Sequence, residues 1–315
     1  MAHRIHVIVT CTQSKRVAPA PELLVRNLPQ QSSVQKRCSD WTRRLAKSTE
    51  PATPARDLYC GDHWSVALDL EKPTATGKVQ LWIISAGHGL VRADDEIQSY
   101  GAAFATGGED SVASGKEGVS EWWRVLTNGN LAPAKKGPQS LRALASGDRG
   151  SSILIAASPS YLAAVGEDIA AAAKCLSDPD RMIIVSAGGR ADSGILAPYL
   201  LRVDARLQQT LGGAMQSLNV RIARDLLRRR RKPGLSLASA RRTYDRIQSD
   251  LAEYKYPERQ PLTDREVLSF IEGELRKNPD ATRSRLLRQL RDSGKACEQH
   301  RFSKIFSTAG VGLYD

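Results

Sequence analysis

The segment Gln80-Leu-Trp-Ile-Ile-Ser-Ala-Gly-His-Gly-Leu90 decides the fold of this chain. Its apolar half has the length of a buried strand, and it stops at a turn of small residues around one imidazole. This turn, residues 85–89, is expected to offer bare backbone amides beside His88, because Gly87 and Gly89 add no side-chain bulk. The alternative is that the small residues only form a tight strand-to-helix turn, in which His88 caps local backbone groups.

Three other segments repeat this plan, with apolar strands that end near Cys11, Ser158 and Ser186. In open α/β sheets, ligands bind outside the carboxyl ends of the strands, so the four polar strand exits are expected to converge on one pocket. The candidate substrate-binding residues at these exits, besides Gly87 and Gly89, are Cys11, Thr12, Ser14, Lys15, Ser158, Ser160, Tyr161, Ser186, Gly188 and Arg190.

The first 225 residues alternate between strand-like and helix-like segments, with helical composition at 161–176 and 207–230. This order predicts an α/β domain with a parallel sheet between two helical layers. Residues 12–58 are polar with little strand signal, and residues 107–118 form a loop rich in Gly and Ser. Loops of such length are usually functional or disordered.

The composition excludes several classes of protein. Of the 315 residues, 41% are hydrophobic, as in an ordinary soluble protein, and no apolar run approaches the roughly 18 residues of a membrane span. The N-terminus lacks an apolar signal core, so a cytoplasmic protein without a membrane partner is expected. The five cysteines are scattered and show no zinc-ligand spacing, and there is no Walker A or GxGxxG motif. We therefore expect no disulfide, metal or nucleotide cofactor.

Basic residues gather toward the C-terminal end. From Arg221 onward there are 22 Lys and Arg against 13 Asp and Glu, a net charge of +9 out of +12 for the chain. Basic side chains concentrated in one region favour a partner with a phosphate backbone, here double-stranded DNA. The alternative for the run at residues 228–232 is a solvated helical face or a hinge.

The last residues predict a separate helical unit. Residues 226–262 look like a linker with one helix at 237–254. Residues 263–315 are expected to form three helices. Thr263 and Asp264 cap the first of them, and Gly294 ends the second. Helices joined by a short Gly-containing turn favour a helix-turn-helix type of DNA-binding module, although another basic three-helix bundle would look similar. The candidate DNA contacts are Arg283, Arg285, Arg288, Gln299, Arg301 and Lys304.

The cluster Tyr59-Cys-Gly-Asp62-His-Trp64 combines a carboxylate, an imidazole and two aromatic rings. Such a cluster suits a flat heterocycle, although Asp62 could simply cap a helix and Trp64 could belong to the core. Tyr100 and Phe104 could sandwich a base or fill the core.

Together these motifs resemble a bacterial group of uracil-DNA-glycosylase-like domains, which is related to the accessory domain of archaeal tRNA-guanine transglycosylases. The resemblance rests on Cys11-Thr-Gln-Ser-Lys15, Leu58-Tyr-Cys-Gly-Asp-His-Trp64, Ser85-Ala-Gly-His-Gly-Leu90, Tyr100-Gly-Ala-Ala-Phe104, Ser158-Pro-Ser-Tyr161 and Ser186-Ala-Gly, and covers most of residues 1–225. With its basic tail, the chain is similar to anti-phage DNA glycosylases that excise α-glucosylated hydroxymethylcytosine from T-even-type phage DNA.

The resemblance implies base flipping followed by cleavage of the N-glycosidic bond without a cofactor. Superfamily members commonly carry a GxDP-like motif after the first strand and an HPS-like motif after the last, and this chain departs from both. Asp62 is therefore the first candidate for general base or electrostatic stabiliser, with Gln13 as the alternative for positioning water. His88 would hydrogen-bond the leaving base.

Two other functions stay open. One is a DNA-binding regulator whose α/β domain senses a nucleotide-like ligand. The other is a nucleobase-exchange enzyme with a covalent sugar intermediate on Asp62. The oligomeric state and the identity of the excised base do not follow from the sequence.

Overall fold

A computed structural model describes residues 3–30, 32–72, 78–128, 137–187, 194–230, 233–255 and 258–311 of the chain. It divides into two compact units, Met1–Ala252 and Glu253–Asp315. Each unit has its own hydrophobic core.

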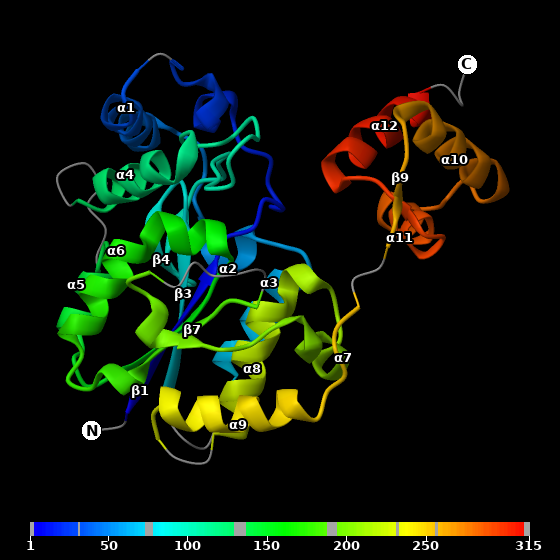
Figure 1. Ribbon diagram of the computed structural model, residues 1–315. Helices are drawn as coiled ribbons and strands as arrows, with labels where there is room; N and C mark the ends of the chain where they lie inside the picture. Colours follow the sequence, from blue (N-terminus) through cyan, green and yellow to red (C-terminus); the bar gives the residue numbers. More distant parts are fainter. Residues whose placement is uncertain are drawn as a thin grey trace. The chain divides into compact units, whose positions relative to one another are not determined.

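The first unit is built around a sheet in the order β4-β3-β1-β6-β7-β8, which is parallel except for β4 (Figure 1). The strands of this sheet are β1 (Arg4–Thr10), β3 (Lys78–Ser85), β4 (Gly89–Arg92), β6 (Ser152–Ala156), β7 (Met182–Val185) and β8 (Leu200–Leu201). The central strands are almost wholly buried. Their continuous apolar runs are typical of parallel strands that are covered on both faces.

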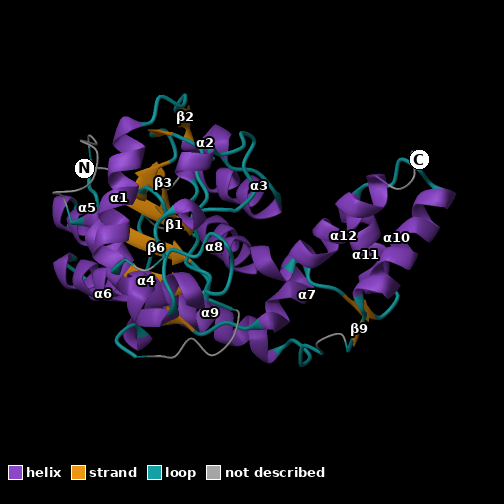
Figure 2. Cartoon of the chain, turned by 90° about the horizontal axis from the view of Figure 1, so that it is seen from above, coloured by secondary structure: helices purple, strands orange, loops and turns teal. Residues whose placement is uncertain are grey.

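Helices cover both faces of the sheet, as Figures 1 and 2 show. One face carries α1 (Val34–Lys47), α4 (Gly115–Thr127), α5 (Leu141–Gly147) and α6 (Pro159–Cys175). The other carries α3 (Asp62–Leu68), α8 (Leu218–Arg229) and α9 (Leu237–Ser249). The short elements are α2 (Ala55–Leu58), α7 (Gln208–Leu211) and the pair β2 (Thr53–Pro54) and β5 (Glu96–Ile97). The predicted α/β class with a mostly parallel sheet is confirmed.

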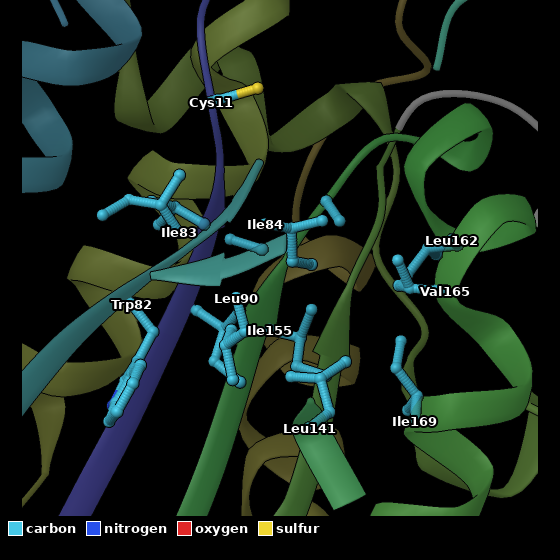
Figure 3. Close-up of a cluster of buried hydrophobic side chains, with 14 of the residues drawn as sticks. Cys11, Trp82, Ile83, Ile84, Leu90, Leu141, Ile155, Leu162, Val165 and Ile169 are labelled. Atoms are coloured by element: carbon cyan, nitrogen blue, oxygen red, sulfur yellow. The ribbon is translucent and has the colours of Figure 1, made fainter. Parts of the chain in front are cut away.

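The core between the sheet and α6 is made of branched side chains. In Figure 3, Leu162, Val165 and Ile169 of α6 face Ile155 of β6. All four side chains are buried. The three from α6 share one face of the helix, because they recur at helical spacing.

The segment between β1 and α2 contains a helix that the sequence did not predict. Helix α1 begins after Ser33, whose side chain accepts a hydrogen bond from the amide of Lys36. Trp41 is fully buried within it, and its Nε1 donates to the carbonyl of Gly87 at 2.7 Å. Its buried positions Cys38, Trp41 and Leu45 recur at helical spacing, but most of the helix is polar, which conceals it in the sequence.

The boundary between the units differs from the predicted one. Helix α9, expected inside a linker, belongs to the first unit: Tyr244 is buried and donates to the carboxylate of Asp225 on α8 at 2.9 Å. Gln248 of the same helix donates to the carbonyl of Arg202 at 2.9 Å. In the sequence, a single helix flanked by prolines resembles a linker, because the elements that its buried face packs against are not adjacent in the chain.

The second unit contains α10 (Asp264–Lys277), α11 (Arg283–Asp292) and α12 (Gln299–Val311), with a parallel pair of two-residue strands, β9 (Gln260–Pro261) and β10 (Lys295–Ala296). Thr263 is the N-cap of α10, as predicted, whereas Asp264 is the first residue of the helix. Glu266 completes a capping box with Thr263. The sequence predicts the third helix directly after Gly294, but residues 295–298 form β10 and the turn before α12.

Among the residues that the structure describes, no helix has both the length and the apolar character that crossing a membrane requires.

Candidate functional site

The carboxyl ends of β3, β1, β6 and β7 lie side by side along one edge of the sheet. From β1 the chain crosses first to β3 and later returns to β6 on the other side of β1. The connection that leaves β1 runs to β3, whereas the one that leaves β6 runs in the opposite direction to β7. The gap between β1 and β6 is therefore a topological switch point, where open α/β sheets bind ligands. The predicted convergence of the four strand exits agrees with this topology.

Cys11 and Tyr161 meet across this switch point. The Sγ of Cys11, just after β1, and the phenol oxygen of Tyr161, on α6, are 3.0 Å apart and share a hydrogen bond. Burial raises the pKa of the Tyr161 phenol above its usual value, so the phenol is neutral at physiological pH.

A chain of hydroxyl groups lies beside this pair. The Oγ of Ser85, at the end of β3, donates to the phenol oxygen of Tyr100 at 2.7 Å, and the phenol oxygens of Tyr100 and Tyr59 are 2.9 Å apart. All three residues are buried. Burial raises the pKa of both phenols, so the chain carries protons rather than negative charge.

Lys15 covers the two tyrosine rings. A short antiparallel bridge joins Lys15 to Tyr59 and places its Nζ 4.3 Å from the centroid of the Tyr100 ring and 5.8 Å from that of Tyr59. Nζ also donates to the carbonyl of Thr12 at 3.2 Å. Burial lowers the pKa of Lys15 below its usual value, although the nearby Cys11 and Asp110 act in the opposite direction. The amine is thus a partly buried cation held by aromatic faces.

The expectation of bare amides in the turn after β3 is wrong. The amides of Gly87 and His88 both donate to the Oγ of Ser85, at 3.3 and 3.0 Å. A serine at the end of a strand satisfies these donors locally, as serine often does in turns. Gly87 is required for another reason, since a Cβ there would lie 2.4 Å from the Tyr100 ring.

His88 is directed into the protein. It is 7% exposed, and its ring lies at 81° to the ring of Tyr100 with 4.9 Å between the centroids. Its Nε2 shares a 3.0 Å hydrogen bond with the carbonyl of Gln98. These contacts favour the alternative in which His88 supports the local backbone. Gly89 has a φ of 72°, which favours glycine in the turn.

Asp62 begins α3 and is tied to α8. Its carboxylate accepts hydrogen bonds from Ser217 at 2.5 Å and from Arg221 at 2.8 Å, while its side chain is 52% exposed. The hydrogen bond from Ser217 and the charge of Arg221 lower the pKa of Asp62, so the group is ionised at neutral pH. The carboxylate therefore combines an exposed position with a fixed orientation.

Two residues near this edge were given no role by the sequence analysis, although His63 belongs to the cluster from Tyr59 to Trp64. Asn219 of α8 bridges two strand exits, accepting from the amide of Ala187 at 2.7 Å and donating to the carbonyl of Ala157 at 3.0 Å. His63 hydrogen-bonds the backbone of Thr10, and its buried Nε2 lacks a partner among the described residues. Nothing in the sequence around Asn219 marks it, because its role arises only from the packing of α8 on β6 and β7.

The other residues predicted for substrate have varied surroundings. Gln13 and Ser14 are exposed after β1, whereas the hydroxyl of Thr12 donates to the Ser14 carbonyl at 2.8 Å. Ser158 and Ser160 share a hydrogen bond at 3.0 Å.

After β7, the buried Oγ of Ser186 lacks a partner among the described residues, so it is a candidate to bind a ligand. Gly188 and Arg190 lie outside the residues that the structure describes.

Trp64 and Phe104 belong to the core. Trp64 is 1% exposed and stacks edge-on against Tyr59, and its Nε1 donates to the carbonyl of Arg56 at 2.9 Å. Phe104 is 1% exposed and packs edge-on against Tyr161. The structure gives both rings the packing role that the sequence left open, and Tyr100 is likewise buried.

In the second unit, the predicted DNA contacts lie on α11 and α12. Arg285 and Arg288 are exposed on α11, while Arg283 of the same helix donates to Ser303 at 2.6 Å. On α12, Gln299 and Lys304 are exposed, and Arg301 pairs with Asp264 of α10 at 2.5 Å. Arg285 and Arg288 are therefore the more available pair.

The basic charge divides unevenly between the two units. Residues 221–252 hold 10 Lys and Arg against 3 Asp and Glu, whereas residues 253–315 hold 12 against 10. Most of the C-terminal excess thus belongs to α8, α9 and the segment between them, in the first unit. The excess of basic residues after Arg221 therefore lies mostly in the first unit and not in the helical module predicted to bind DNA.

No model of a known protein family matches this sequence, and neither does any curated protein.

Proposed function

We propose that the chain is a DNA glycosylase that flips a modified cytosine, such as glucosylated hydroxymethylcytosine of phage DNA, and cleaves its N-glycosidic bond. The observation that carries the proposal is the meeting of polar groups at the switch point between β1 and β6, where Cys11, Tyr161 and Lys15 adjoin a buried hydroxyl chain. The motif resemblance described above supports the same class of reaction.

In this proposal the neutral phenols and the hydroxyl chain act as hydrogen-bond donors. As the glycosidic bond breaks, electron density moves onto the base, and a donor in a dry environment stabilises it strongly. Tyr161 adjoins the switch point, and the Lys15 cation lies over the ring of Tyr100 in the hydroxyl chain. In this proposal they take the role that the sequence analysis gave to His88, which is buried against Tyr100.

The sugar develops positive charge in the same step, and a fixed carboxylate stabilises it. Asp62 is ionised and held by Ser217 and Arg221, so it is a candidate for this role and for orienting the water that attacks the sugar. Gln13 remains the alternative for positioning water.

The experiment is mass spectrometry of the bases released from unmodified and from hypermodified phage DNA. We expect release of the modified base, followed by strand breaks on mild alkali treatment, because abasic sites are alkali-labile. A Tyr161→Phe variant, which loses the hydroxyl and keeps the ring, should release at least about tenfold less base.

The two other functions give different results in this assay. A ligand-sensing DNA-binding regulator would release no base from either DNA. A base-exchange enzyme would incorporate a labelled free base and leave no alkali-labile sites. Either outcome would overturn the proposal.

A further inference from the structure

The turn from β6 into α6 lies beside a second polar strand exit. Strand β6 ends at Ala156, and α6 begins at Pro159. The neighbouring parallel strand β7 ends at Val185, whose carbonyl accepts a hydrogen bond from the amide of Ala157 at 3.2 Å. The start of α6 and Ser186 are therefore neighbours at one edge of the sheet.

The first turn of α6 has backbone donors that the chain leaves free. Ser158 is the N-cap residue, but its side chain makes no cap hydrogen bond and instead shares one with the hydroxyl of Ser160. Among the described residues, the first amide of the helix with a partner is that of Leu162, which donates to the carbonyl of Ser158 at 3.0 Å. Pro159 has no amide hydrogen, so the amides of Ser160 and Tyr161 are available to a ligand.

This end of α6 is also electropositive. The peptide dipoles of its 17 residues place partial positive charge at the N-terminus, and no acidic residue in the first turn neutralises it. Ser160 is exposed, so solvent reaches the turn. Helix N-termini that follow a strand bind phosphate groups in many α/β proteins. Because every helix begins with amides of this kind, the feature alone does not define a site.

Ser186 supplies an independent sign of a ligand. It is 6% exposed, and its buried Oγ has no hydrogen-bond partner within the part of the chain that the structure describes. A buried hydroxyl without a partner costs free energy, and few persist in native proteins. Directly beside it, Asn219 pairs with the amide of Ala187 and the carbonyl of Ala157. The Ser186 hydroxyl is thus a donor for a group outside the chain.

The strand register directs Ser186 toward α6. Ile155 of β6 faces α6 in Figure 3, and the register pairs Ile155 with Ile184 of β7. Side chains of a strand alternate between the two faces, so Ser186, two residues after Ile184, points to the same face. The hydroxyl of Ser186 and the free amides of α6 therefore converge from two neighbouring segments.

We propose that the start of α6, together with Ser186, binds a phosphate group. The amides of Ser160 and Tyr161 and the hydroxyl of Ser186 would donate to its oxygens. A free phosphate and a phosphate of the DNA backbone offer the same chemistry, and DNA as the source rests on the proposed function. In that case the site would hold the strand beside Tyr161, whose phenol adjoins the switch point.

Isothermal titration of the full chain with inorganic phosphate tests the site, and we expect a Kd below about 10 mM. Ser160→Asp should weaken phosphate binding at least about tenfold, because its carboxylate repels the anion at the helix N-terminus. The same charge stabilises the helix, so this variant should fold. The matched control, Ser160→Asn, has nearly the same size without the charge and should bind phosphate like the original chain.

Ser186→Ala separates a ligand donor from a structural hydroxyl. It should weaken phosphate binding at least about tenfold, the loss expected for one hydrogen bond to a charged group. The free energy of unfolding without phosphate should stay the same or rise, because the variant removes a buried hydroxyl that lacks a partner. A structural hydroxyl would give the reverse, with lower stability and unchanged phosphate binding.

The source of the phosphate follows from the same titration in the presence of saturating duplex DNA. Competition by DNA identifies a backbone phosphate, and unchanged phosphate binding identifies a free one. The proposal fails if inorganic phosphate does not bind, or if Ser160→Asp and Ser186→Ala bind it like the control. Base release is assayed separately on the unchanged chain, and its absence together with intact phosphate binding would refute the glycosylase proposal alone.

Discussion

At the scale of single residues, the candidate site depends on close contacts that leave no space for added atoms. Gly87, Ser85 and Tyr100 form one such contact, because the Tyr100 ring covers Gly87 while its hydroxyl accepts from Ser85. The sequence suggested that the space beside Gly87 is open to a ligand. In the structure, the ring of Tyr100 occupies that space.

We expect Gly87→Ala to destabilise the protein by about 1–3 kcal/mol, because the new methyl group must displace the buried Tyr100 ring. Guanidinium chloride unfolding measures this change. The control is Gly150→Ala, where a Cβ meets nothing within 4 Å. A Gly87→Ala protein as stable as this control would show that Tyr100 moves freely and that the hydroxyl chain is not fixed.

The variant Asp62→Asn tests whether the Asp62 carboxylate takes part in base release. If Asp62 stabilises the positive sugar, base release should fall at least about a hundredfold, since one positioned charge commonly contributes that much. The side chain is half exposed, so the loss of its ion pair with Arg221 should change stability by less than about 1 kcal/mol. Unchanged release by a folded variant would restrict Asp62 to holding α3 against α8 and would leave Gln13 as the candidate.

At the scale of elements, the pairing of β1 with β3 includes a buried histidine. His6 of β1 accepts from Trp82 of β3, and burial is the main cause of its lowered pKa. The pKa of His63, at the start of α3, is lowered for the same reason. Both groups are neutral in the folded protein at neutral pH.

Stability should therefore fall in acid. The folded pKa of each histidine lies below its unfolded value of about 6.5, so the unfolded chain takes up more protons between these two pH values. The free energy of unfolding decreases as pH falls below about 6.5, which urea titrations at pH 7.5, 6.5 and 5.5 can measure.

Asp148→Asn should make this decrease steeper, because the negative charge of Asp148 raises the pKa of His6 and partly offsets the effect of burial. His6→Gln should make it shallower. A pH dependence that is identical in all three proteins would mean that His6 does not titrate with folding.

At the scale of the whole molecule, the distribution of charge decides where DNA would bind. The unit Glu253–Asp315 has exposed arginines on α11 but a small net charge, whereas α8 and α9 belong to the more basic segment of the first unit. Salt dependence of DNA binding separates the two surfaces, since each phosphate contact contributes nearly one unit to its slope.

We expect the double change of Arg285 and Arg288 to Gln to flatten this slope by nearly two units, as measured in binding titrations with duplex DNA between about 50 and 200 mM salt. The comparison is the same change at Arg242 and Arg246, two exposed arginines of α9. If the α9 variant flattens the slope and the α11 variant does not, the phosphate contacts lie on the first unit and the helical unit has another role.

The sequence by itself determined the parallel α/β class, the four strand exits and the cap of α10. These features depend on local patterns: apolar runs, small residues at strand ends, and a threonine three residues before a glutamate.

Tertiary structure alone decided what surrounds each candidate site residue. Tyr100 closes over Gly87, Ser217 and Arg221 bind Asp62, and Asn219 joins β6 to β7. Such partners are far apart in the chain, up to 159 residues for Asp62 and Arg221. The packing of whole helices brings them together, and no local pattern encodes that.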